Sequence, residues 1–171
     1  MTASPQSSSS ADNPLLAAWR TPFATPPFDA IRPEHVLPAL TQAFSDHVRE
    51  IDAITYDPAE PDFANTIVAL ERAGRLLDRV SAVFHALVSA HSNEALLAIE
   101  GEVALRSARH WNAILMDAVL FGRIAKLYHE RAHLKLTPEQ QRLLERTYTR
   151  FRRAGAGLDE AAKTRMAAIN E

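Results

Sequence analysis

One stretch of the chain has residue types and a spacing that could bind a metal ion, His129-Glu130-Arg131-Ala132-His133. On a helix, the four-residue step between the histidines puts both imidazoles on one face as zinc ligands, and the glutamate can act as a base on zinc-bound water. A third ligand would have to come from elsewhere, and Asp159 and Glu160 are the nearby downstream acids outside the intervening helix. A minimal zinc protease using His129, Glu130 and His133 is therefore one hypothesis.

The apolar pattern around this motif argues against that hypothesis. The helix predicted over residues 117–133 directs Leu120, Ile124 and Leu127 inward. At 100° per residue, His129 and His133 lie about 140° and 180° from Ile124, on the side that faces water. A catalytic zinc ion needs a shaped, partly dry cavity. We therefore predict no catalytic, cofactor-binding or metal-binding residue in this sequence.

A second candidate site is a set of arginines in the helix predicted over residues 137–155, where a guanidinium group could bind a phosphate or a peptide carboxylate. The near-neutral charge of the chain and the neighbouring Glu139 and Glu145 instead favour a solvated or salt-bridged face. The arginines are Arg142, Arg146, Arg150, Arg152 and Arg153.

Composition narrows the class of protein. The 171 residues include 47% hydrophobic residues, only 5 Gly and 7% aromatics, which is typical of a globular helical protein. There is no cysteine, so disulfides and thiolate metal sites are excluded. A formal charge of −2 disfavours nucleic-acid and membrane-surface binding, and neither a secretory signal nor a membrane span is visible. We expect a cytoplasmic protein with no nucleic acid or membrane as partner.

The element around which the rest must pack is a helix predicted over residues 63–91. Its apolar or small residues recur at steps of three and four, which keeps them on one stripe. Charged residues, among them Arg75, Asp78 and Arg79, fall on the opposite side and are predicted to face solvent. The stripe consists of Ile67, Leu70, Gly74, Leu77, Ser81, Phe84 and Val88.

The remaining chain predicts an all-α fold, an antiparallel array of about six helices with an extended proline-rich amino-terminal arm. Residues 1–12 are expected to be a disordered Ser-rich tail. In the arm, residues 13–38, prolines block helix while large apolar side chains require cover. Further helices are predicted over residues 33–54 and from Ser92 or Asn93 to Met116. The helix at Thr137-Pro138-Glu139-Gln140 has a capping box and ends at Gly155. A sixth begins at Leu158-Asp159 and has no stop signal before Glu171, which favours a chain that is the front part of a longer protein.

Several ungapped stretches resemble the amino-terminal region of the thimet-oligopeptidase-type zinc metallopeptidases, which include oligopeptidase A and peptidyl-dipeptidase (dipeptidyl carboxypeptidase). The resemblance covers about residues 13–171 and favours the peptidyl-dipeptidase branch. The stretches are Asn13-Pro14-Leu15-Leu16 with Trp19, Thr21-Pro22-Phe23, Pro26-Pro27-Phe28-Asp29 with Ile31, Pro33-Glu34-His35, Pro38-Ala39-Leu40, Phe63-Ala64-Asn65-Thr66-Ile67-Val68-Ala69-Leu70-Glu71, Gly74-Arg75-Leu76-Leu77-Asp78-Arg79-Val80, Leu143-Leu144-Glu145 with Tyr148 and Phe151, Arg153-Ala154-Gly155-Ala156, and Leu158 with Ile169-Asn170-Glu171.

This resemblance implies a helical wall of a deep channel that admits short peptides, with the zinc site in a later region that is absent here. It therefore implies zinc for the full-length enzyme, no cofactor in residues 13–171, and the missing catalytic region and short peptides as partners. We predict that this chain is one region of a hydrolase and that the chain by itself has no catalytic activity. The alternatives are a free-standing helical binding protein, which recruits a partner through its arm or an exposed helix face, and the minimal zinc protease above.

Overall fold

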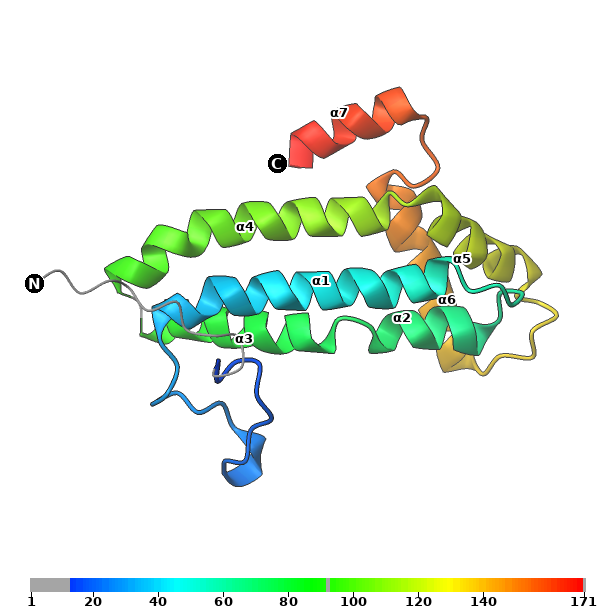
Figure 1. The fold of residues 1–171 in the computed structure, drawn as a ribbon. Coiled ribbons are helices and arrows are strands. Elements are labelled where there is room, and N and C mark those ends of the chain that lie inside the picture. Colours follow the sequence, from blue (N-terminus) through cyan, green and yellow to red (C-terminus); the bar gives the residue numbers. More distant parts are fainter. Residues whose placement is uncertain (1–12, 92, 171) are drawn as a thin grey trace, which may run out of the picture. The chain divides into compact units, whose positions relative to one another are not determined.

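The computed structural model describes residues 13–91 and 93–170, and within them the chain forms helices and turns and no strand (Figure 1). The all-α prediction is confirmed. The predicted tail, residues 1–12, and the candidate cap Ser92 lie outside the described residues. The elements are η2 (Pro22–Ala24), η3 (Pro33–His35), α1 (Val36–Thr55), η4 (Phe63–Val68), α2 (Ala69–Arg72), α3 (Arg75–Ala90), α4 (Glu94–Leu115), α5 (Ala118–Glu130), α6 (Pro138–Ala154) and α7 (Glu160–Asn170).

Contacts divide the described chain into two compact units, each with its own core. The first holds residues 13–47 and 74–103, and the second holds residues 48–73 and 104–170. Helices α1 and α4 each contribute one part to each unit. None of the described helices is both long and apolar enough to cross a membrane.

In the first unit, α3 runs antiparallel to its neighbours. The start of α3 lies beside the end of the α1 segment, because Gly74 is in close contact with the His47 ring. Helix α4 begins four residues after α3 ends, and so short a separation makes consecutive helices antiparallel. The buried residues of this core are Leu15, Ile31, Val36, Ala39, Leu40, Ala43, Leu77, Val80, Val83, Phe84, Leu96 and Val103.

Arg79 is one of the groups that hold the proline-rich arm in the first unit, beside the buried side chains of Leu15 and Ile31. This guanidinium group donates hydrogen bonds to the backbone carbonyls of Leu15 (2.8 Å) and Leu16 (3.2 Å) and lies 4.9 Å from the centre of the Trp19 ring. The prediction that Arg79 faces solvent is therefore wrong, because the arm supplies carbonyl groups that the guanidinium satisfies. Not all of the arm is covered, since Phe23 is fully exposed.

The central helix predicted over residues 63–91 is interrupted, and that prediction of one continuous element is wrong. Wide π-helical turns in η4 lead into the short α2, Ala73 is extended, and Gly74 has a φ of 78° before α3 begins. The predicted stripe is divided accordingly. Ile67 and Leu70 pack in the second unit, whereas Leu77 and Phe84 pack in the first.

The second unit is built on α5 and α6, with the carboxyl-terminal parts of α1 and α4 and with η4. Its buried residues are Ile51, Ile54, Ile67, Ile114, Leu120, Ile124, Leu127, Leu144, Phe151 and Ala156. The inward faces predicted for the helices at 117–133 and 137–155 are confirmed at Ile124, Leu127, Leu144 and Phe151.

Most helix ends lie where local capping chemistry predicts them. The side chains of Asn93, Asp117 and Thr137 each accept a hydrogen bond from the amide three residues ahead, at 3.0, 2.7 and 3.3 Å. The Thr137 amide in turn donates to the side-chain oxygen of Gln140 at 3.0 Å, which completes the capping box. Helix α6 ends at Gly155, whose φ of 101° suits a residue without a Cβ atom.

Candidate functional site: an arginine-lined groove on α6

The histidine motif does not adopt the geometry that a zinc site requires. Helix α5 ends at Glu130, short of the predicted end at His133, so the two histidines do not share a helical face. The His133 amide instead donates to the Glu130 carbonyl at 2.8 Å in a turn, and His129, Glu130 and His133 are all exposed. Within residues 13–91 and 93–170, no group of three or more His, Cys, Asp or Glu side chains is placed to hold a metal ion.

The third ligand considered for this motif has another role. The Asp159 carboxylate accepts a hydrogen bond from the Ala162 amide at 2.8 Å and so caps α7. The side chain of Glu160 lies outside the described part of the chain.

Residues near the end of α5 explain why the helix stops early. The Arg131 guanidinium lies 4.1 Å from the centre of the Tyr128 ring and donates to the Tyr128 carbonyl at 2.6 Å, a carbonyl that a continuing helix would use. The chain then turns through Lys135, which has a φ of 49°, before α6 begins. The prediction that this helix reaches His133 is therefore wrong.

A groove of about 1000 Å³ lies along α6 in the second unit. Four of the five arginines selected from the sequence line it, namely Arg142, Arg146, Arg150 and Arg153, together with two carboxylates, Glu71 of α2 and Glu145 of α6. Arg152, the fifth, does not line the groove. Four cations against two anions make its wall basic.

The arginines of the groove differ in what they contact. Arg142 lies 4.0 Å from the Glu145 carboxylate, and Arg150 lies over the Trp111 ring at 5.0 Å from its centre. The guanidinium groups of Arg146 and Arg153 have no hydrogen-bond or ion-pair partner among the residues that the structure describes. Arg142 thus has the ion pair that the sequence suggested, and Arg146 and Arg153 are exposed, whereas the contact of Arg150 with Trp111 was not predicted.

Stacked aromatic rings fix α6 against α5 beside the groove. Tyr128 and Tyr148 stack with their centres 3.9 Å apart and their planes 2° from parallel, and Phe121 stacks on Tyr148 at 5.5 Å. Tyr128 also lines the groove. Aromatic pairs of this kind add about 0.5–1.5 kcal/mol beyond the area they bury, so they help to hold the arginine-bearing helix α6 against α5.

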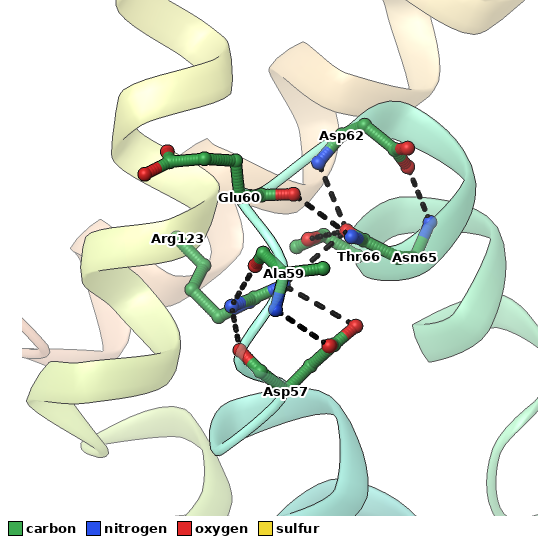
Figure 2. A network of polar contacts seen from close by, with 7 residues as sticks. All are labelled: Asp57, Ala59, Glu60, Asp62, Asn65, Thr66 and Arg123. Carbon is green, nitrogen blue, oxygen red and sulfur yellow. Dashed lines mark hydrogen bonds and ion pairs between the residues drawn. The ribbon is translucent and has the colours of Figure 1, made fainter.

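A second polar cluster, which we call the Arg123 network, holds the loop between α1 and η4 (Figure 2). Arg123 of α5 is buried and donates to the carbonyls of Asp57 (2.9 Å) and Ala59 (3.2 Å) and to the Asn65 amide oxygen (3.3 Å). Asp57 adds a carboxylate oxygen 3.8 Å from the guanidinium. Every partner belongs to the loop or to η4, so this arginine positions backbone and is not available to a ligand.

The loop has a second attachment and an internal cap. Lys126 donates to the Glu60 carboxylate, and this hydrogen bond lowers the pKa of Glu60 and raises the pKa of Lys126. Asp62 and Asn65 exchange reciprocal side-chain bonds of 2.6 and 2.9 Å at the start of η4. Asp62 therefore caps η4.

Sequence reasoning did not find the Arg123 network. The sequence feature that could have indicated it is the position of Arg123 beside Leu120, Ile124 and Leu127, which form the buried face of α5. A charged residue in an apolar stripe requires a partner, because an unpaired buried charge is costly.

The comparisons with known proteins follow the predicted resemblance. No protein-family model matches the chain. It is 38% identical over 158 residues to dipeptidyl carboxypeptidase of Salmonella typhimurium and 37% identical to dipeptidyl carboxypeptidase of Escherichia coli, each match covering 92% of this chain and 23% of the relative. Oligopeptidase A of Salmonella typhimurium is 28% identical over the same length.

These matches confirm the resemblance to dipeptidyl carboxypeptidase and oligopeptidase A, and the former is the more similar of the two. The chain is homologous to their amino-terminal region and spans less than a quarter of their length. The greater part of each relative therefore has no counterpart in these 171 residues.

Proposed function

We propose that this chain is the amino-terminal helical region of a longer zinc-dependent peptidyl-dipeptidase, and that it forms part of the wall of a channel for short peptides. The observation that carries the proposal is the match over 92% of this chain to only 23% of each dipeptidyl carboxypeptidase. A similarity that extends through nearly all the helices supports a shared fold and a shared place in a larger enzyme.

The described residues do not fit a zinc site, so the proposal assigns them no step in peptide cleavage. The two histidines of the 129–133 motif lie on either side of the end of α5, and Asp159 is occupied as a helix cap. The ion and the base that activates water would belong to the part of the enzyme that this chain lacks. The contribution of residues 13–170 is then to support and to bind peptide, and a sequence without cysteine fits a reducing compartment such as the cytoplasm.

A chimeric enzyme tests the proposal. The matched 158 residues of the Escherichia coli dipeptidyl carboxypeptidase are replaced by those of this chain, and release of dipeptides from an unstructured peptide is measured by mass spectrometry. We expect no hydrolysis by the 171-residue chain alone, none by the Escherichia coli protein without its matched segment, and restored hydrolysis by the chimera.

Two results would contradict the proposal. One is a folded chimera, shown by circular dichroism and gel filtration, that releases no more dipeptide than the shortened enzyme. The other is chelator-sensitive hydrolysis by this chain alone.

A free-standing binding protein is the second candidate, and exposure of the arm favours it. Phe23 is fully exposed and Phe28 is 48% exposed, which leaves two aromatic rings for a partner. Sedimentation equilibrium separates the candidates. A free-standing protein should remain a monomer or closed dimer at all concentrations, whereas a region that has lost its neighbour should self-associate through uncovered apolar surface.

A further inference from the structure

One face of helix α6 packs in the core of the second unit, and the opposite face carries exposed arginines. Leu144 and Phe151 are buried in the second unit and fix one face. Arg146 and Arg153 each follow one of these residues by two positions, which places them about 160° around the helix from the core. Both are exposed, so their charges lie outside the packing that holds the helix.

The helix positions of three arginines, Arg146, Arg150 and Arg153, follow one another along that outer side, and we call this set the row. The rise of an α-helix separates Arg146 from Arg150 by about 6 Å and Arg150 from Arg153 by about 4.5 Å along the axis. The Arg150 guanidinium lies 5.0 Å from the centre of the Trp111 ring, and a contact with a ring face brings no neutralising anion. Arg142, at the other end, is already offset by Glu145. The available positive charge is therefore concentrated from Arg146 to Arg153.

We propose that this row binds the carboxylates of acidic side chains in an extended peptide, so that the enzyme prefers peptides with acidic residues. The inference rests on the proposed function, because it takes peptides as the substrate of the whole protein. An extended chain repeats its side chains on one face about every 6.6 Å, which is close to the rise between Arg146 and Arg150. Arginine suits carboxylates because its planar fork can donate two parallel hydrogen bonds.

The charge of the chain favours an acidic peptide over a nucleic acid. A nucleic-acid surface normally carries a large excess of Lys and Arg, whereas this chain has 19 basic and 21 acidic residues. Glu71 and Glu145 also lie in the groove, where they would repel a continuous row of phosphates. A peptide with spaced carboxylates can place neutral residues opposite them.

Direct binding to the 171-residue chain is the first test. The probe is a fluorescein-labelled, amidated peptide of alternating Glu and Ala, compared with its Gln-Ala counterpart by fluorescence anisotropy at low salt. We expect the acidic peptide to bind more tightly than the neutral one and to dissociate as salt approaches about 0.15 M, where charges beyond about 8 Å are screened.

A matched pair of double variants locates the binding. Arg146→Gln with Arg153→Gln removes two charges from the row, and we expect acidic-peptide binding to weaken about five- to tenfold. Arg152→Gln with Arg165→Gln removes two exposed charges from α6 and α7 outside the groove, and we expect a change below about twofold.

Three results would overturn the inference: equal weakening by both double variants, equal binding of the acidic and neutral peptides, or tighter binding of a single-stranded oligothymidylate than of the acidic peptide.

The chimeric enzyme separates failure of this inference from failure of the proposed function. Its kcat/KM for an acidic substrate peptide should exceed that for the neutral one. Arg146→Gln with Arg153→Gln should remove this difference, and Arg152→Gln with Arg165→Gln should retain it. A chimera that cleaves both peptides equally well retains the proposed function and loses the inference. A folded chimera that cleaves neither contradicts the proposed function, and the binding assay then still decides whether the row of arginines takes acidic peptides.

Discussion

The break at Gly74 gives the sharpest prediction about the fold. Gly74 has a φ of 78°, and a Cβ atom added there would lie 3.0 Å from both Cε1 and Nε2 of His47. Forcing an alanine into the left-handed region costs about 1–2 kcal/mol, and the contact with a ring that is only 3% exposed adds to this. Replacing glycine also lowers the conformational entropy of the unfolded chain, which stabilises the folded state by about 0.4–1 kcal/mol and offsets part of this cost. We expect Gly74→Ala to destabilise the protein by about 1–2 kcal/mol.

Gly101→Ala is the matched control in the same unit. Gly101 lies inside α4, and an added Cβ atom would meet nothing within 4 Å. Alanine is the better helix former by about 0.5–1 kcal/mol, so this variant should be more stable than the wild type.

Urea and thermal unfolding followed by far-UV circular dichroism measure both variants. For a chain of this size, each kcal/mol shifts the melting temperature by about 2–4 °C. We expect Gly74→Ala to melt below the wild type and Gly101→Ala to melt above it. The reasoning would be refuted if Gly74→Ala were as stable as the wild type while Gly101→Ala gained stability, because the break would then impose no conformational requirement.

Three further predictions concern polar groups of the second unit. Arg123→Met should cost about 2–3 kcal/mol in urea unfolding, since it removes charged hydrogen bonds to two carbonyls, whereas Arg152→Met should change stability by less than about 0.5 kcal/mol. Glu60→Gln should destabilise the protein at neutral pH, and the difference from the wild type should vanish as the pH falls through the lowered pKa of Glu60, because only the ionised carboxylate favours the folded state. A difference that persists in acid would contradict this assignment. Dialysed protein should contain no stoichiometric zinc, and His129→Ala should leave that content unchanged; zinc that is present in the wild type and lost in His129→Ala would instead support the minimal protease.

Local sequence chemistry was enough to predict where most helices begin and end. Asn93, Asp117 and Thr137 cap helices through bonds to amides three residues away, and Gly155 ends α6 through its own φ. Such interactions involve neighbours in the sequence, so they can be identified before the tertiary structure is known. The arginines of α6 were likewise visible as a set, although the sequence did not show that four of them line a groove and that Arg152 does not.

The features that only the tertiary structure decided are those that depend on contacts between residues far apart in the chain. The sequence by itself determined an all-α chain, the apolar faces of its helices, their caps and the resemblance to dipeptidyl carboxypeptidase. The periodicity of residues 63–91 is equally compatible with one helix or two, and the contact of Gly74 with His47 accompanies the broken form. Arginine is a residue type that usually faces solvent, yet Arg79 and Arg123 each donate to backbone carbonyls more than 60 positions away in the sequence. A side chain's environment is set by the groups that packing brings to it, and the helical period specifies only the direction in which it points.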